Sequence, residues 1–288
     1  MDTLTTPRTT GNAPGIAPEL ARSWLLVAAT RSETFDEALR SPADAVVLDI
    51  EDAVDASRKD EAREDVARWL REGGSAWVRI NDVTSDHWAS DLEALRSAPG
   101  LRGVVLAKTE SGNQVTDTFH RLGGGVPVVA LVESALGIEN ATEIARAEGA
   151  FRLAFGSGDF RRDTGMSADR EAMAYPRARL VIASRCGDLP GPIDGPTVGT
   201  SHPLLREQSA ITVSMGMTGK LCLAPDQTSV VNEVISPTRT DVEWARSFLQ
   251  DFDARGRVVR DGSDLPRLGR ARKIMKLAQA FDAHLAVR

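Results

Sequence analysis

The sequence has few cysteines, few aromatic residues and no long apolar run. Its 288 residues include two cysteines, Cys186 and Cys222, without CxxC spacing, which argues against a disulfide framework or thiolate metal site and favours two buried thiols. No run approaches the about eighteen apolar residues of a membrane span, and residues 1–20 lack the apolar core of a signal peptide. A net charge of -6 also disfavours a broad nucleic-acid surface. We therefore expect a cytoplasmic protein that binds neither nucleic acid nor membrane.

Short runs rich in Val, Ile and Leu are present instead, and they alternate with charged segments of helical spacing. This alternation predicts parallel strands joined by helices, an α/β fold. The runs cover residues 23–29, 44–50, 76–80, 103–107, 126–132, 151–155, 191–198 and 220–224, the seventh being interrupted by prolines. Eight such units over roughly 200 residues favour a (β/α)8 TIM barrel, and an open doubly wound sheet is the alternative.

The pattern changes to helices without strands after Pro225. We expect a flexible tail over residues 1–20, a barrel over 21–235 and a C-terminal helical extension over 236–288. Because such an extension needs a surface to pack against, a neighbouring subunit is expected, which makes the protein a homo-oligomer.

Two carboxylates follow neighbouring strands, where TIM-barrel chemistry takes place. Glu133 ends the fifth run, and Asp159 follows the sixth after Gly156 and Gly158, which allow the backbone to approach a ligand closely. Carboxylates without clustered imidazoles or thiols suit Mg2+, with substrate oxygens and water completing the coordination. The alternative is that Glu133 caps the next helix and Asp159 ends a turn.

Further charged residues end the second, third and fourth runs. Arg79 offers a planar fork for a substrate carboxylate, although an ion pair with a nearby acid explains it equally well. The acids Asp49, Glu51 and Asp52 could orient Arg79, hold metal-bound water or cap the next helix. Lys108 ends the fourth run and joins the same mouth.

Several ordered motifs resemble those of the citrate lyase β-subunit-like proteins, which include malyl-CoA and citramalyl-CoA lyases, within the HpcH/HpaI aldolase superfamily. The resemblance extends from Arg22 to about Ala280. It rests on RSWLLV, DAVVLDIEDAV, VRIN, LAKTES, ALVESALGIENATEIA, LAFGSGDF, MGMTGKLCLAPDQ and VVNEVISPT.

The resemblance implies a role for individual residues. Glu133 and Asp159 would hold Mg2+, Arg79 would bind the substrate carboxylate, and Arg22 would lie near the acyl substrate. Asp264, in the shortened Gly262–Pro266 motif, corresponds to the catalytic aspartate of the family. The remaining residues expected to contact substrate are Asp49, Glu51, Asp52, Lys108 and Gly158. The resemblance also implies a trimer.

The expected activity is a Mg2+-dependent lyase that converts a 3-hydroxyacyl-CoA thioester into an acyl-CoA and a 2-oxo acid. Two departures from the family pattern keep alternatives open: residues 27–33 read VAATRSE where a CoA-docking loop is usual, and Ala224 replaces the usual histidine. A thioesterase or a non-catalytic ligand-binding barrel remains possible, as does an acyl-carrier protein in place of CoA.

Overall fold

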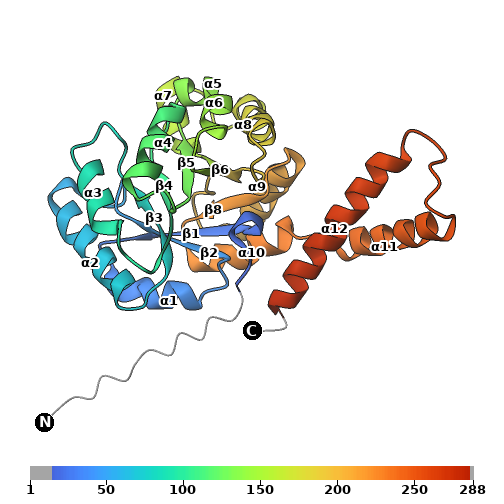
Figure 1. Ribbon diagram of the computed structural model, residues 1–288, viewed down its shortest axis with the longest axis horizontal. Helices are drawn as coiled ribbons and strands as arrows, with labels where there is room; N and C mark the ends of the chain where they lie inside the picture. Colours follow the sequence, from blue (N-terminus) through green and yellow to red (C-terminus); the bar gives the residue numbers. More distant parts are fainter. Residues whose placement is uncertain (1–14, 286–288) are drawn as a thin grey trace, which may run out of the picture.

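The strands form a closed parallel barrel (Figure 1). The computed structural model describes residues 15–285, with side chains up to Asp282. The strands are β1 (Ser23–Ala28), β2 (Ala45–Asp49), β3 (Ala76–Ile80), β4 (Leu101–Leu106), β5 (Val128–Val132), β6 (Ala150–Phe155), β7 (Ile193–Asp194) and β8 (Gly219–Cys222). They lie in chain order, and β8 closes the barrel on β1. The predicted (β/α)8 barrel is thus confirmed, and the open sheet is excluded.

The seventh strand is much shorter than predicted. The sequence predicted a strand over 191–198, whereas β7 holds only Ile193 and Asp194. Pro192 and Pro196 flank it, and proline cannot donate a hydrogen bond to a neighbouring strand. Pairing therefore stops on both sides, and residues 195–198 form a loop at the mouth of the barrel.

Helices surround the barrel and continue beyond it. They are α1 (Phe35–Arg40), α2 (Lys59–Arg71), α3 (Trp88–Leu95), α4 (Gly112–Arg121), α5 (Ala135–Glu139), α6 (Ala141–Ala145), α7 (Ser157–Thr164), α8 (Ala174–Cys186), α9 (His202–Ser214), α10 (Pro225–Ile235), α11 (Arg239–Ala254) and α12 (Asp264–Leu285). Short 3-10 turns cover Pro18–Leu20, Ser32–Thr34 and Ala56–Arg58. Cys222 is buried as expected, but the expectation is wrong for Cys186, which is exposed at the end of α8. Among the described residues, none of the helices is long and apolar enough to cross a membrane.

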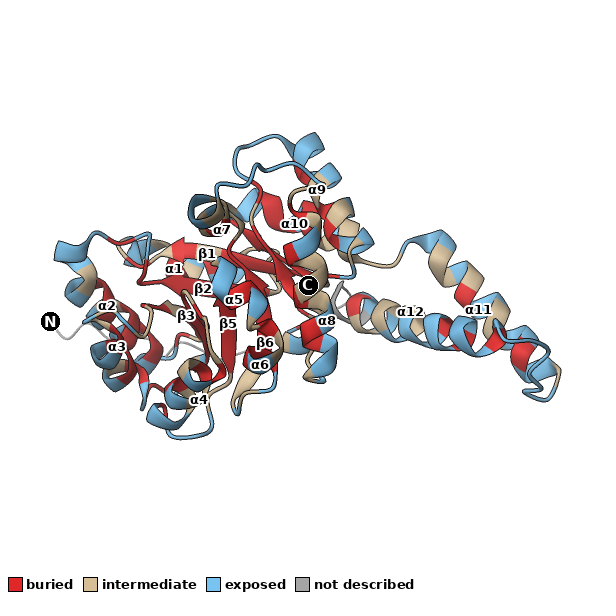
Figure 2. Cartoon of the chain, turned by 90° about the horizontal axis from the view of Figure 1, so that it is seen from above, coloured by how far each residue is buried: buried red, intermediate tan, exposed pale blue. Residues whose placement is uncertain are grey.

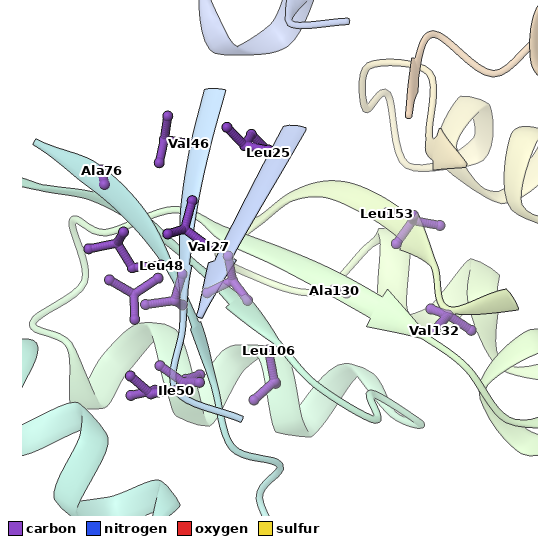
Figure 3. Packing of buried hydrophobic residues seen from close by; sticks show 14 of the residues in the cluster. Leu25, Val27, Val46, Leu48, Ile50, Ala76, Leu106, Ala130, Val132 and Leu153 are labelled. Atoms are coloured by element: carbon purple, nitrogen blue, oxygen red, sulfur yellow. The ribbon is translucent and has the colours of Figure 1, made fainter. Parts of the chain in front are cut away.

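Alternating strand residues build two apolar layers. Side chains such as Leu25, Val27 and Leu48 belong to the layer between strands and helices (Figure 3). Trp24 and Trp77 belong to a second cluster, and their rings meet edge to face at 5.0 Å. This alternation is what a barrel filled by side chains requires. The interior is therefore packed, which leaves the rim as the place for a site.

The amino end of the barrel is sealed by Arg152, which is fully buried in β6. Its guanidinium donates to the carbonyl groups of Gly191 and Ala21 and to the hydroxyl of Thr218. Burial lowers the pKa of Arg152 to about 9. These contacts close the floor, so a ligand reaches the barrel from the carboxyl ends of its strands.

The helices α11 and α12 form a hairpin that projects away from the barrel (Figures 1 and 2). Thr238 begins α11 with a capping box to Asp241. The far part of α12 returns to the barrel, where the ring of Phe281 lies 3.9 Å from the guanidinium carbon of Arg22. The turn of the hairpin lies at the end distant from the barrel (Figure 1). Val258 belongs to this turn and Leu265 to the first turn of α12, and both side chains are exposed.

Candidate active site

Arg79 is fixed beneath the mouth of the barrel by Asp49. Its Nε and Nη2 atoms donate to the two carboxylate oxygens of Asp49 at 2.8 and 2.5 Å. Its Nη1 atom lies 3.3 Å from Glu51 Oε2. Burial alone would lower the pKa of Arg79, but the charges of Asp49 and Glu51 raise it above its ordinary value. Asp49 therefore orients a permanent cation, and Nη1 lies toward the acidic side of the mouth.

Glu51 links Arg79 to a second cation, Lys108. The Nζ atom of Lys108 lies 2.6 Å from Glu51 Oε1 and 3.6 Å from Asp52 Oδ1. Burial raises the pKa of Glu51, while the charge of Arg79 opposes that rise. For Lys108, burial would lower the pKa, but Glu51 raises it further. The acids at the end of β2 thus organise both cations, and the cap of the following turn is Asp55 instead.

Glu133 occupies a narrow, buried position after β5. Its Oε1 atom accepts a hydrogen bond of 2.8 Å from the backbone N–H of Lys108, which has a left-handed φ of 46°. A Cβ atom on Gly156 would lie 2.1 Å from Glu133 Oε2, so only glycine fits there. Burial raises the pKa of Glu133 to about 8. Even with the charge of Arg79 opposing the rise, this carboxyl group holds a proton at neutral pH unless a metal ion binds it.

Asp159 lies in the first turn of α7, next to Glu133. Its Oδ1 atom is 3.0 Å from Arg162 Nη2, one turn along the same helix. The charge of Asp159 contributes to the raised pKa of Glu133. The alternative roles of a helix cap for Glu133 and a turn end for Asp159 do not hold. Ser134 caps α5 by accepting a hydrogen bond from Gly137 N, and Asp159 lies within α7.

The two acids fit a hard divalent cation with two protein ligands. A cavity of about 230 Å3 opens over them and is lined by Lys108, Glu110, Glu133, Ser134, Asp159, Arg162 and Asp163. Within residues 15–282, no group of three or more His, Cys, Asp or Glu side chains could hold a metal ion. A Mg2+ ion bound by Glu133 and Asp159 would therefore take its remaining ligands from substrate and water.

Three of the predicted residues lie elsewhere or act differently. Arg22 precedes β1 at the opposite end of the barrel, where its guanidinium pairs with Asp44 at 2.7 Å. Asp264 begins α12 at the hairpin turn and pairs with Arg255 at 2.7 Å. Gly158 is exposed, and a Cβ atom added there would meet nothing within 4 Å, so Gly156 is the glycine that the site requires. The structure does not bring Arg22 or Asp264 to the mouth of their own barrel.

Other residues of the cavity were missed from the sequence. Arg162 could have been found from the sequence, because it follows Asp159 by three residues, a spacing that places both side chains on one face of a helix. Glu110 accepts a hydrogen bond from the Ser134 hydroxyl, and Asp163 accepts one from Ala135 N. These contacts join the ends of different strands, and nothing local in the sequence indicates them.

A larger cavity of about 400 Å3 lies at the opposite end, between the barrel floor and α12. Leu20, Met217 and Leu277 are among its mostly apolar lining. It contains neither of the two neighbouring carboxylates nor Arg79. The smaller, charged cavity is the candidate active site because Glu133, whose pKa is raised by burial, and Asp159 lie together there.

Comparison with known proteins places this site in a family. Residues 22–225 match the HpcH/HpaI aldolase/citrate lyase model, and residues 240–282 match the HpcH/HpaI aldolase C-terminal domain. The citrate lyase subunit beta-like protein of Deinococcus radiodurans is 30% identical, over 92% of this chain and 98% of its own length. The mitochondrial citramalyl-CoA lyase of Rattus norvegicus is 30% identical, over 83% of this chain and 80% of its own.

Solved structures agree with these matches. The CitE protein of Mycobacterium tuberculosis, in complex with magnesium, acetoacetate and coenzyme A, has a TM-score of 0.77 and 27% identity, covering 91% of this chain and 99% of that one. The citrate lyase beta subunit of M. tuberculosis, complexed with oxaloacetate and magnesium, has a TM-score of 0.67 and 29% identity, covering 76% and 99%. The predicted family and its lyase class are confirmed: the chain belongs to the HpcH/HpaI aldolase/citrate lyase family.

Proposed function

We propose that this protein is a Mg2+-dependent lyase that cleaves a 3-hydroxyacyl-CoA thioester into an acyl-CoA and a 2-oxo acid, or joins the two in reverse. The observation that carries the proposal is the pair Glu133 and Asp159, whose carboxylates lie in one cavity, with the charge of Arg79 acting on Glu133. The relatives named as citramalyl-CoA lyase and the neighbours complexed with magnesium, oxaloacetate and coenzyme A support the same chemistry.

Arg79 binds the carboxylate beside the reacting carbon. Asp49 holds the guanidinium plane, and Nη1 pairs only with Glu51 among the described residues, at 3.3 Å, which leaves one of its two N–H groups for substrate. Because the arginine is already oriented, little side-chain entropy is lost when the carboxylate binds. Arg79 also opposes the negative charge that develops on the neighbouring oxygen.

Mg2+ bound by Glu133 and Asp159 would supply a Lewis acid for the hydroxyl and carboxylate oxygens. During cleavage the hydroxyl loses its proton, the adjacent carbon–carbon bond breaks, and its electron pair goes to the acyl thioester as an enolate. The enolate carbon then takes up a proton. In the reverse direction a base must remove a proton from that carbon.

Asp264 of a second copy is proposed as that base. Its hydrogen bond to Arg255 lowers the pKa of Asp264 to about 2, so it is ionised at neutral pH as a base must be. The turn around it exposes Val258, Val259 and Leu265, with exposed fractions of 62%, 48% and 60%. Exposed apolar side chains on a projecting turn favour contact with another copy, which supports an oligomer with a shared site.

An assay of malyl-CoA, citramalyl-CoA and citryl-CoA tests the function. We expect a 2-oxo acid to appear with Mg2+ and to disappear after chelation. Arg79→Lys should lower kcat/KM by about a hundredfold, because lysine cannot reproduce a bidentate contact.

The products separate this activity from its rivals. Release of free thiol without a 2-oxo acid would identify a thioesterase instead. Absence of both products for every thioester, despite binding, would indicate a ligand-binding barrel.

A further inference from the structure

The charged cavity contains an arginine, Arg162, that makes a single ion pair with the chain itself. Arg162 contacts Asp159 Oδ1 through Nη2 at 3.0 Å, and its side chain is 73% exposed. No other ion pair or hydrogen bond of its guanidinium occurs among residues 15–282. Lys108, the other cation of the cavity, is engaged by Glu51 and Asp52. Arg162 is therefore the cation best able to reach an additional anion.

The position of Arg162 complements that of Arg79. The side chain of Arg79 is 12% exposed and its charge acts on Glu133, whereas Arg162 is 73% exposed and lies beside Asp159. A small acid bound over Glu133 and Asp159 therefore lies beside Arg162, while its first carboxylate is the one assigned to Arg79 in the function proposed above. The residues that line this cavity are charged or hydroxylated, with no apolar side chain among them.

This polar lining favours a charged end of the bound acid over an alkyl end. An alkyl end would meet no apolar residue there, so it would gain little from contact with the lining. A carboxylate end would gain a charge-assisted hydrogen bond from the guanidinium, which can be bidentate. The neighbouring acids Glu110 and Asp163 each direct an oxygen to the chain, toward the Ser134 hydroxyl and Ala135 N respectively.

We propose that Arg162 is a specificity-determining residue that binds a second carboxylate on the 2-oxo acid half of the substrate. The preferred 2-oxo acid is then a dicarboxylate such as oxaloacetate, and not a monocarboxylate such as pyruvate. This inference rests on the function proposed above, and it adds the class of 2-oxo acid that the site takes.

Isothermal titration calorimetry on the full chain with saturating Mg2+ tests the inference, with oxaloacetate, pyruvate and coenzyme A as separate ligands. We expect oxaloacetate to bind about tenfold more tightly than pyruvate. Arg162→Gln should bring this ratio close to one by weakening oxaloacetate alone. Arg162→Lys should keep part of the preference, because a point charge remains without the fork.

Two controls separate this role from others. Arg161→Gln removes the neighbouring positive charge, whose Nε donates to Ser157 O, and should leave the ratio as in the wild type. A Mg2+ titration without organic ligand should show no loss of metal affinity in Arg162→Gln, because the variant removes a cation that competes for Asp159.

Several outcomes would overturn the inference. An unchanged ratio in Arg162→Gln would exclude the second carboxylate as the partner, while leaving the proposed function intact. Weaker coenzyme A binding with an unchanged ratio would assign Arg162 to a phosphate of the thioester. If the wild-type protein bound neither 2-oxo acid, the proposed function would fail, and this inference with it.

Discussion

At the scale of single residues, the site depends on an acid placed where water cannot stabilise its charge. Glu133 receives one backbone hydrogen bond, from a residue with left-handed φ, and packs against a glycine that leaves no room for a side chain. Such a carboxyl group is unfavourable in the ionised form unless a cation neutralises it. This burial of Glu133 is consistent with its proposed role as a ligand of a metal ion.

Burial raises the pKa of Glu133 to about 8, which predicts how stability depends on pH. Between about 4.5 and 8 the folded chain holds a proton on Glu133 that the unfolded chain has released, so the free energy of unfolding falls as pH rises across this window. In metal-free buffer, Glu133→Gln should remove this fall and be on the order of 4 to 5 kcal/mol more stable than wild type at pH 8.5. Near pH 4 the two proteins should differ little.

Urea unfolding at several pH values measures this difference. Glu61→Gln on α2, where the side chain is 61% exposed, is the matched control and should follow the wild type. A wild-type curve parallel to that of Glu133→Gln between pH 5 and 8 would show that Glu133 ionises normally in the metal-free protein.

At the scale of secondary-structure elements, helices behind the barrel hold the strand ends in place. Lys59, the first residue of α2, donates from Nζ to the carbonyl oxygens of Ile50 and Glu51 and to Asn81 Oδ1 at 2.7 Å. Asn81 in turn donates to Asp91 Oδ2 of α3 at 2.7 Å. This network fixes the backbone from which Glu51 reaches Arg79 and Lys108.

Replacing Lys59 should therefore affect catalysis more than folding. Lys59→Met should lower kcat/KM about tenfold, because a small displacement of Glu51 misplaces both cations. The melting temperature should fall by only a few degrees, because Lys59 is half-buried and the groups that lose its three hydrogen bonds lie near the rim of the barrel. Lys59→Arg should recover part of the activity.

The control for this prediction is Arg58→Met, which removes the same charge one residue earlier. Arg58 pairs with Glu61 on the surface and does not contact the end of β2. If both variants lost activity equally, net charge rather than the position of Glu51 would account for the loss.

At the scale of the whole molecule, the hairpin of α11 and α12 separates Asp264 from the mouth of its own barrel (Figure 1). A protein that uses Asp264 must bring it from another copy. Mixing Asp264→Asn chains with Glu133→Gln chains should restore activity after subunit exchange, since roughly a quarter of randomly formed sites would hold both residues intact.

The matched control mixes Glu133→Gln with Arg79→Lys. Both residues belong to one barrel, so no exchanged subunit can supply a complete site and activity should stay at the level of Arg79→Lys alone. Recovery in this second mixture would point to re-formation of wild-type chains or contamination. Full turnover by Asp264→Asn alone would exclude Asp264 from the reaction.

The barrel was predictable because its strands are nearly continuous apolar runs, as in DAVVLDI, and their spacing repeats along the chain. β7 was the exception, because proline limits pairing at positions that hydrophobicity does not reveal. Glu133, Asp159 and Arg79 were identified from their places at strand ends. The structure brings Glu133 and Asp159 to one cavity, and Arg79 lies near enough to Glu133 for its charge to affect the pKa of that acid. Their metal-binding and substrate-binding roles stay predictions.

Arg22 was expected near the substrate but lies at the opposite end of the barrel. The sequence places Arg22 at the first strand, but only the direction of that strand decides that the arginine faces the closed end, paired with Asp44. Cys186 differs from its expected burial for a similar reason, since it ends α8 on the side that faces solvent.

By itself, the sequence determined the parallel barrel, the family and the set of charged residues at strand ends, because hydrophobic periodicity and residue type are local properties. The tertiary structure decided which of those charges meet. Asp49 rather than Glu51 holds the plane of Arg79, and Lys108 supports Glu133 through its backbone while its side chain pairs with Glu51. These contacts join different strands, whose distances depend on barrel closure, and no local pattern specifies them.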